Sequence, residues 1–509
     1  MATPARLPRS TPEEQGVHPR ALLRLVDALF AQPELHSIMV LRHGRVVAEG
    51  WAHPYAADRP HQLYSLSKSF TATAVGLAAS EGLLGLDDRV VDLLADRAPV
   101  APDPLLAALR VRHLLTMTSG HHDDPSSAVF EGRDDRGGRG GLGDRGGLGD
   151  WVRAFFAQPL THEPGTHFVY NTAATYVLSA IVQQVSGQRL LDYLGPRLLD
   201  PLGITGATWE RSPQGIDTGG FGLSVRTEDV AAFGQLYLQD GVWAGRRLLP
   251  EGWVAQASAA QVPNGDPVTG GDWWQGYGFQ LWRCRHGAYR GDGAFGQFAV
   301  VLPEQDAVVA ITSGVPDMQA TLDALWEHLL PGLADEPLAP DDEGRAALAA
   351  RLAALRLDPP VGEPGSEAAR RMAGRTVTFA PNPWRVREAV LEPGTAADTV
   401  RVRIGRRTLT ARAGHGEPIA QRLRLVPAEP PTALVSAAWT GATTYELTAR
   451  FVETPFVRTV RVEVHGDQVR VRAEVNVSFG PTVVELQGTV GAPAESAPSP
   501  AAPQSVARG

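Results

Sequence analysis

Lysine occurs once in this chain: Lys68 is the only lysine among its 47 lysine and arginine residues. Arginine stays protonated in proteins, whereas a partly buried lysine can lose its proton and act as a base. Lys68 follows Ser65 by three residues, in the run Ser65-Leu66-Ser67-Lys68. Residues at positions i and i+3 of a helix share a face, so this spacing brings the amine within reach of the Ser65 hydroxyl. The pair predicts a serine nucleophile with a lysine base.

The stretch from Ser65 to Gly82 has the helical spacing that this pair requires, and Gly82 is a suitable end. The apolar residues of one face are Phe70, Ala74, Leu77 and Ala78. Ser65 would stand at the start of the helix, where free backbone amides and the positive end of the dipole favour an oxyanion. The alternative is that Ser65 only caps the helix and Lys68 is an ordinary surface residue.

A second group must pass a proton to the leaving group, and Tyr170 is the candidate. It follows a turn at Pro164-Gly165 and directly precedes a helix, a position from which a side chain can project into a cleft. A lysine cation nearby would favour the phenolate form of the tyrosine. The alternative is core packing, because Tyr170 is one of nine tyrosines.

Helices and paired strands are mixed along the first part of the chain, which indicates an α/β or α+β fold. Residues 37–51 contain two strand-like runs joined by a turn, as in a β-hairpin. Residues 173–185 have helical spacing, and residues 298–312 contain two strands around a turn.

Changes in composition predict the domain organisation. Residues 1–335 form the first domain, within which the glycine-rich run 132–150 is expected to be a mobile surface loop. Proline and acidic residues accumulate around one alanine-rich helix in residues 336–370, which we interpret as a linker. Residues 371–490 alternate apolar and polar side chains, as in a small antiparallel β domain, and the tail 491–509 is expected to be disordered.

The bulk composition excludes several function classes. Hydrophobic residues make up 43% of the chain and charged residues 20%, as in ordinary folded proteins. The net charge of −9 comes with interspersed acidic and basic residues, so no nucleic-acid partner is expected. We find neither a secretory signal nor an apolar run of about 18 residues, which predicts a cytoplasmic protein with no membrane partner. Cys284, the single cysteine, allows no intramolecular disulfide.

Five segments together resemble a known family. They are SLSKSF (65–70), VRHLLTMTSGHH (111–122), PGTHFVYN (164–171), GGFGLSVRTEDVAAFGQLYL (219–238) and GDGAFGQFAVVLPEQDAVVAITSG (291–314). Their order and spacing resemble those of class C β-lactamases, family VIII-type esterases and D-aminopeptidase-like relatives. The resemblance implies a β-lactamase/transpeptidase-like fold, in which an antiparallel sheet is flanked by helices and joined to an all-helical subdomain.

The resemblance also implies roles for the candidate residues. In that family the first serine is acylated, the lysine deprotonates it, and the tyrosine of a Y-x-N motif passes the proton to the leaving group. These roles would fall on Ser65, Lys68 and Tyr170, and the family needs no metal or cofactor. Thr172 occupies the place of the usual asparagine, so Asn171 would be the substitute for the amide that contacts substrate.

The third motif departs further from a true β-lactamase. It reads Gly291-Asp292-Gly293-Ala294-Phe295-Gly296-Gln297, which resembles the G-x-x-G-Q form of esterase and amide-hydrolase relatives. Asp292 stands where a β-lactamase holds a cation, so its charge would repel a substrate carboxylate. The resemblance implies that the N–H groups of Ser65 and Ala294 form the oxyanion site. Gly293 lies next to Ala294, and Gly296 would allow the backbone to approach closely.

Two further clusters each have two interpretations. Five aromatic residues before the third motif could wall an apolar acyl pocket or simply pack the core. They are Trp273, Trp274, Tyr277, Phe279 and Trp282. His121 and His122, followed by two aspartates, could suggest a metal site, but no spaced third ligand group is evident, so none is predicted.

The sequence therefore predicts a serine hydrolase that acts on small-molecule esters or amides through an acyl-enzyme. An esterase is the first candidate. The alternatives are a D,D-carboxypeptidase or D-aminopeptidase, a true β-lactamase, and a catalytically inactive binding module. An α/β-hydrolase would need a G-x-S-x-G motif, which the sequence lacks. The C-terminal β domain is expected to cover or extend the cleft, and the oligomeric state stays open.

Overall fold

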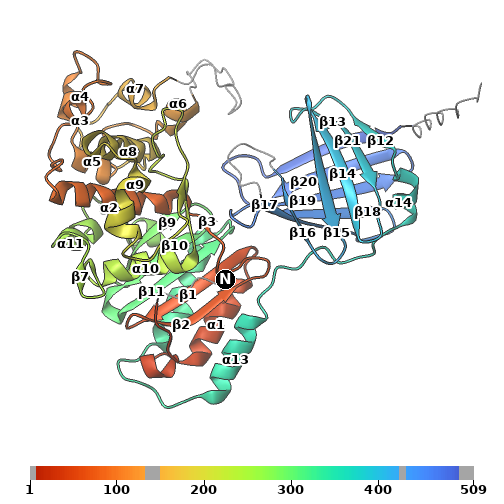
Figure 1. The fold of residues 1–509 in the computed structure, drawn as a ribbon, viewed down its shortest axis with the longest axis horizontal. Coiled ribbons are helices and arrows are strands. Elements are labelled where there is room, and N and C mark those ends of the chain that lie inside the picture. The colour runs from red at the N-terminus through yellow and green to blue at the C-terminus, as the bar shows by residue number, and fades with distance from the viewer. Residues whose placement is uncertain (1–6, 132–148, 424–431, 492–509) are drawn as a thin grey trace, which may run out of the picture. The chain divides into compact units, whose positions relative to one another are not determined.

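The computed structural model describes residues 7–131, 149–423 and 432–491. The chain divides into two compact units (Figure 1). Unit 1 comprises Met1–Leu357 with Val452–Pro455, and unit 2 comprises Asp358–Phe451 and Phe456–Gly509. The expected glycine-rich loop and C-terminal tail lie almost wholly outside the described residues.

The centre of unit 1 is a six-stranded antiparallel sheet. In spatial order its strands are β2 (Arg45–Trp51), β1 (Leu35–Arg42), β11 (Ala307–Ser313), β10 (Gln297–Leu302), β9 (Tyr289–Gly293) and β8 (Trp282–Arg283). Every residue of β1, β10 and β11 is buried, because helices cover both faces of the sheet. Two of the predicted strand pairs, the hairpin in 37–51 and the pair in 298–312, are confirmed.

Helices pack on the two faces of this sheet and form a separate helical region above it (Figure 1). They are α1 (Pro19–Phe30), α2 (Ser67–Ser80), α3 (Val90–Leu93), α4 (Pro104–Ala108), α5 (Val111–Leu115), α6 (Ser126–Glu131), α7 (Trp151–Phe156), α8 (Thr172–Ser186), α9 (Leu190–Leu194), α10 (Thr227–Leu238), α11 (Trp253–Ser258), α12 (Met318–Ala324) and α13 (Asp342–Ala353). Along β1, Ile38 and Val40 pack in the cluster that contains α1, whereas Met39 and Leu41 pack in the cluster that contains α2 and α10. No helix in the described part of the chain is long and apolar enough to cross a membrane.

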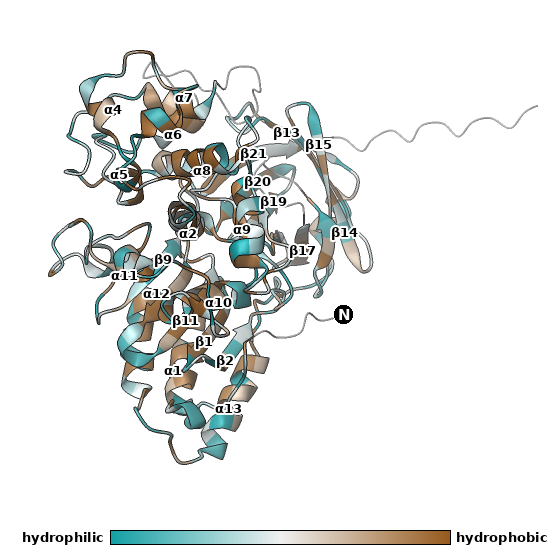
Figure 2. Cartoon of the chain, turned by 60° about the vertical axis from the view of Figure 1, so that its left-hand side comes forward, coloured by the Kyte–Doolittle hydropathy of each residue, from teal (hydrophilic) through white to brown (hydrophobic). Residues whose placement is uncertain are grey.

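Helix α2 lies between the sheet and the helical region (Figure 1). The sequence predicts one apolar face, but the structure buries every residue of this helix from Ser67 to Ala78. Small side chains allow this close packing: a Cβ at Gly76 would lie 2.6 Å from the Trp253 ring. The neighbouring helix α8, whose residues are largely hydrophobic (brown in Figure 2), packs against α2 on the side of the helical region. A polar residue near the start of α2 is therefore placed deep in the protein.

Three short strands hold the chain just before α2. They form a sheet in the order β3 (His61–Gln62), β5 (Leu223–Val225) and β4 (Thr208–Trp209). The backbone N–H of Leu63 extends this pairing by donating to Leu223 O at 2.8 Å. The chain therefore enters α2 from a fixed point. A second small sheet pairs β6 (Val242–Trp243) with β7 (Arg246–Arg247).

The sequence places the helix of residues 336–370 in a linker. In the structure this helix, α13, belongs to unit 1. Leu348 is buried in the same cluster as α1, and a Cβ at Gly50 would lie 2.8 Å from Leu352 Cδ2. The apolar side of this helix thus covers β2. The proline-rich and acidic flanks pointed to a linker, but buried Leu348 and partly buried Leu352 decide the position of the helix.

Unit 2 is a ten-stranded antiparallel sheet, and it confirms the predicted C-terminal β domain. Its elements are α14 (Glu367–Met372), β12 (Thr376–Phe379), β13 (Val386–Glu392), β14 (Ala397–Ile404), β15 (Arg407–Gly414), β16 (Ile419–Arg422), β17 (Thr432–Trp439), β18 (Thr444–Arg450), β19 (Val457–His465), β20 (Gln468–Val475) and β21 (Val483–Val490). One parallel bridge joins Gly414 of β15, at one end of the strand order, to Ser436 of β17, which is next to last at the other end.

Candidate active site

Ser65 and Lys68 lie together at the junction between β3 and α2. Ser65 is half-buried in the 3-10 turn η2 (Tyr64–Leu66), which runs directly into α2. Lys68 is in the first turn of α2, and its Nζ donates a hydrogen bond of 2.8 Å to Ser65 Oγ. The structure thus brings together the two residues that the sequence paired. A serine hydroxyl at this distance can give its proton to a neutral amine.

The environment of Lys68 makes that neutral amine accessible near neutral pH. The side chain is 1% exposed, and burial lowers the pKa of Lys68 to about 7. The carboxylates of Asp124 and Asp292 act in the opposite direction, because they favour the ammonium form. Burial has the larger effect, so Lys68 can act as a base under ordinary conditions.

Two further oxygens fix the position of the Lys68 amine. Nζ donates to Gly220 O at 2.7 Å and to Thr172 Oγ1 at 3.2 Å. Thr172 begins α8 and occupies the place where the resemblance expects an asparagine. The Gly220 carbonyl was not among the predicted site residues, because nothing in its local sequence marks a contact with a lysine 152 residues away.

Tyr170 lies beside both residues. The Ser65 side chain is near enough to lower the pKa of the Tyr170 hydroxyl, and Lys68 Nζ lies 4.9 Å from the centre of its ring. Burial raises the pKa of Tyr170, and the carboxylate of Asp292 raises it further. This differs from the phenolate that the nearby lysine was expected to favour, because Lys68 is itself buried and able to be neutral. Tyr170 is therefore placed as a neutral hydroxyl that can donate a proton.

Asn171 does not join this group. Its side chain is fully buried, and Oδ1 accepts a hydrogen bond from Ala174 N–H, which caps the start of α8. Its Nδ2 donates to Ser119 Oγ at 3.1 Å. These contacts use the amide to hold the helix start, so it has a structural partner at each end and is not directed at Ser65.

The third motif passes directly beside the Ser65 turn, at the end of β9. A Cβ at Gly293 would lie 1.9 Å from Leu63 O, and one at Gly291 would lie 2.6 Å from Ser69 Oγ. Ala294 is half-buried in the turn that follows, and Gly296 has a positive φ of 91°. Only glycine fits these close approaches, so the motif can bring the Ala294 backbone next to Ser65.

The acidic residue of this motif has its own cation. Asp292 is 7% exposed, and Arg290 Nε donates to its Oδ2 at 2.9 Å. Burial raises the pKa of Asp292, while Arg290 opposes that change. Arg290 also donates to Asp272 O and contacts Cys284 Sγ, so it is fully enclosed. At this edge of β9 the arginine is therefore already paired with Asp292, so it offers no positive group to a substrate carboxylate.

The aromatic residues before the third motif do not form one wall. Trp282 stacks on the Tyr170 ring at 5.3 Å and 21°, and Tyr277 meets Tyr170 edge to face at 6.3 Å. Trp273 lies over the Arg290 guanidinium at 4.2 Å. Phe279 packs in the main core, and Trp274 is 45% exposed. Only part of the cluster therefore borders the candidate site, where it holds the tyrosine ring.

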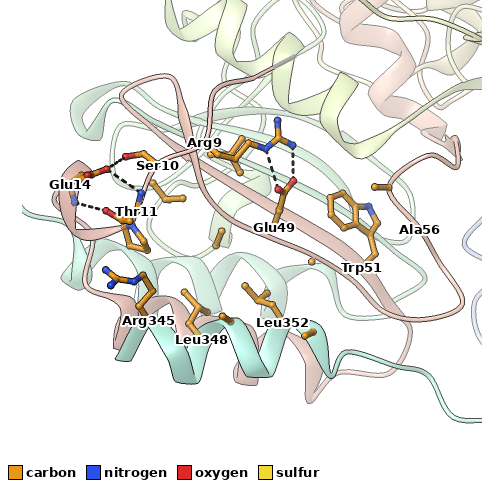
Figure 3. Close-up of a pocket in the computed structure, with 18 residues that line it drawn as sticks. Arg9, Ser10, Thr11, Glu14, Glu49, Trp51, Ala56, Arg345, Leu348 and Leu352 are labelled. Carbon is orange, nitrogen blue, oxygen red and sulfur yellow. Dashed lines mark hydrogen bonds and ion pairs between the residues drawn. The ribbon is translucent and has the colours of Figure 1, made fainter. Parts of the chain in front are cut away.

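A separate hollow of about 950 Å³ opens at the other edge of the sheet, along β2 (Figure 3). The N-terminal segment and α13 form its other walls. Its lining includes the ion pair of Arg9 with Glu49, and it contains none of the candidate residues (Figure 3). Among the described residues there is also no group of three or more histidine, cysteine or carboxylate side chains that could hold a metal ion.

Known proteins resemble this chain to different extents. The 6-aminohexanoate-dimer hydrolase of Paenarthrobacter ureafaciens is 29% identical over 328 residues, covering 62% of this chain and 82% of that protein. Esterase EstB of Burkholderia gladioli is 30% identical over 179 residues, covering 33% of this chain and 44% of that protein. The structure of EstCE1, a hydrolase with promiscuous acyltransferase activity, matches with a TM-score of 0.50 at 19% identity, covering 60% of this chain and 99% of that one, and shows a shared fold.

The model of one family, Beta-lactamase, matches residues 31–330. This range contains Ser65, Lys68, Tyr170 and the third motif, and its fold is the β-lactamase/transpeptidase-like one that the resemblance implied. Because the match spans more than half of the 509 residues, the chain belongs to the Beta-lactamase family of serine hydrolases.

Proposed function

We propose that unit 1 hydrolyses small-molecule esters or amides through an acyl-enzyme on Ser65. The observation that carries the proposal is the 2.8 Å contact between Ser65 Oγ and the buried Lys68 amine. Lys68 is the only lysine of the chain, and it stands where a titratable amine is needed. Tyr170 completes the group as a neutral proton donor.

In the first step, neutral Lys68 takes the proton of Ser65, and Oγ attacks the carbonyl carbon of the substrate. The oxyanion is stabilised by the N–H groups of Ser65 and Ala294. As the carbon–leaving group bond breaks, the leaving alcohol or amine takes the proton of Tyr170, and Tyr170 regains a proton from the Lys68 ammonium. Water then attacks the acyl carbon and gives its proton to Lys68, the ester bond to Ser65 breaks, and Ser65 regains a proton as the acid leaves.

The third motif supports the proposed substrate class. The Arg290–Asp292 pair leaves no free cation at the edge of β9, so a substrate with a carboxylate beside its scissile bond gains no ionic contact there. The names of two relatives, Esterase EstB and 6-aminohexanoate-dimer hydrolase, support esters and small amides as substrates. We place esters first and β-lactams last.

Intact-mass measurement tests the proposal. The wild type, Ser65→Ala and Lys68→Arg are mixed with a fluorophosphonate probe, p-nitrophenyl butyrate and a chromogenic cephalosporin, while hydrolysis is followed. We expect one covalent label on the wild type, none on Ser65→Ala, and a turnover loss of about 10²–10⁴-fold in Lys68→Arg. Ser80→Ala, at the far end of α2, is the matched control and should behave as the wild type.

Each outcome of this experiment has a separate meaning. Labelling of Ser65→Ala at the wild-type rate would refute Ser65 as the nucleophile. Folded wild type that none of the reagents labels would favour a binding module. Faster turnover of the cephalosporin than of the ester would overturn the proposed substrate order and favour a true β-lactamase.

A further inference from the structure

The two turns that would supply the oxyanion donors are joined by a pair of aromatic rings. Tyr64 directly precedes Ser65, and Phe295 directly follows Ala294. Their rings meet edge to face, with centres 5.4 Å apart and planes at 79°. Edge-to-face pairs at this separation are attractive beyond the burial of their surface. The rings therefore connect two segments that are about 230 residues apart in the sequence.

Both residues have an unusual backbone conformation. Tyr64 has φ of 49° and Phe295 has φ of 69°, in the left-handed region that favours glycine. A bulky residue remains there only when its surroundings hold it, and such residues occur most often at functional sites. Here the conformation of Tyr64 sets the direction of the peptide group that carries the Ser65 N–H, and the conformation of Phe295 sets the direction of the peptide group that follows Ala294.

Hydrogen bonds also hold each of the two turns. Phe295 O accepts from Val315 N–H at 3.1 Å and from Ser313 Oγ at 2.9 Å, which fixes this turn to the end of β11. On the other side, Leu66 N–H donates to Leu63 O at 3.2 Å. These contacts hold each turn in place, and the ring pair adds a side-chain contact between the two turns beside the close approach of Gly293 to Leu63 O.

We propose that the contact between Tyr64 and Phe295 sets the separation of the Ser65 and Ala294 N–H groups, so that both reach one substrate oxygen. The two side chains are positioning residues, since they act through the backbone of their neighbours. The inference rests on the proposed function, because it assumes that Ser65 is acylated. It predicts that loss of either ring weakens transition-state stabilisation and leaves ground-state binding of the substrate almost unchanged.

The test compares Tyr64→Ala and Phe295→Ala with the ring-retaining variants Tyr64→Phe and Phe295→Tyr, and with the double alanine variant. We expect kcat for p-nitrophenyl butyrate to fall about 2- to 12-fold in each alanine variant, with KM within about twofold. The ring-retaining variants should keep wild-type kcat. The double variant should lose little more than either single one, because both remove the same contact.

The pH profile separates positioning from general damage. In the proposed mechanism the apparent pKa of kcat/KM is that of Lys68, so it should not move in these variants, whereas a collapsed site would shift it. Phe295→Leu keeps part of the side-chain volume and replaces Phe295→Ala if the latter does not fold. Wild-type kcat in both alanine variants, or equal losses in the ring-retaining variants, would overturn the inference. An unlabelled wild type would instead refute the proposed function.

Discussion

The guanidinium of Arg290 is held against the carboxylate of Asp292, with Nε and Nη2 each 2.9 Å from Oδ2. This pair is close enough to the candidate site for Asp292 to raise the pKa of both Lys68 and Tyr170. The third motif therefore affects the proton chemistry of the site even though its acid is enclosed. A substitution at Asp292 should therefore change the pKa of Lys68 while the direct hydrogen-bond partners of Lys68 stay in place.

The variant Asp292→Asn should move the acid limb of kcat/KM to lower pH. Without the carboxylate the Lys68 ammonium is less favoured, so its pKa falls and the neutral amine forms at lower pH; a shift of about half a pH unit or more is expected. A pH–rate profile normalised to titrated active sites measures it. Asp323→Asn, an exposed carboxylate that pairs with Arg285, is the control. A shift to higher pH would contradict the assignment of Lys68 as the base.

The wild-type profile itself should rise through neutral pH. Because the pKa of Lys68 is lowered to about 7, kcat/KM should be half-maximal near pH 7 and fall below it as the amine becomes protonated. The pKa of Tyr170 is raised, so its loss of a proton should not limit the rate below pH 10. A profile whose acid limb lies below pH 5 would point to a carboxylate as the base instead.

Asn171→Ala should reduce stability and leave catalysis nearly unchanged. The cap on Ala174 N–H is lost, which costs about 0.5–2 kcal/mol of unfolding free energy. Thermal unfolding and steady-state kinetics measure the two effects, and Asn171→Ser, which can still cap the helix, is the control. A large rise in KM without loss of stability would restore the sequence-based role of Asn171 in contacting substrate.

A buried histidine pair predicts acid sensitivity of unit 1. His61 Nε2 lies 3.0 Å from His36 Nδ1, and burial, with a further effect of His36, lowers the pKa of His61 to about 3. The unfolded chain takes up this proton near pH 6.5, so stability is complete above that pH and is lost as the pH falls toward 3. The loss from His61 should be about 2 kcal/mol at pH 5.

The variant His61→Gln tests this assignment by removing the titrating group. Melting temperatures at pH 7 and pH 5 should differ less in His61→Gln than in the wild type. His122→Gln, whose side chain is 72% exposed, should keep the wild-type difference. An unchanged difference in His61→Gln would show that other groups cause the acid loss.

The parts of the site that could be predicted from sequence are those with local signals. Ser65 and Lys68 are one helical turn apart, and the unusual use of lysine marks them. The N-cap role of Asn171 also had a local signal, since asparagine directly before a helical stretch is a preferred cap. Contacts made by tertiary packing had none. Neither Gly220 O on Lys68 nor the ring of Phe295 on Tyr64 can be inferred from neighbouring residues.

The fold shows the same division. The hairpin that forms β1 and β2 is a local structure, and its turn has His43 and Gly44 both at positive φ, as a two-residue hairpin loop requires. The complete burial of α2 depends on two layers built largely from residues distant in the chain, the helical region and the sheet. The apolar periodicity of α2 alone could not reveal the second layer.

The enclosure of Lys68 also gives the folded chain an unusual chemical property. Its only lysine side chain is 1% exposed, so reagents that acylate ε-amines find no accessible target in the described residues of unit 1 while the protein is folded. A lysine-specific protease likewise has a single cleavage point, after Lys68, inside a buried helix. Cleavage there would therefore report opening of α2, and when the protease outpaces reclosing its rate would measure how often the protein exposes its own reactive centre.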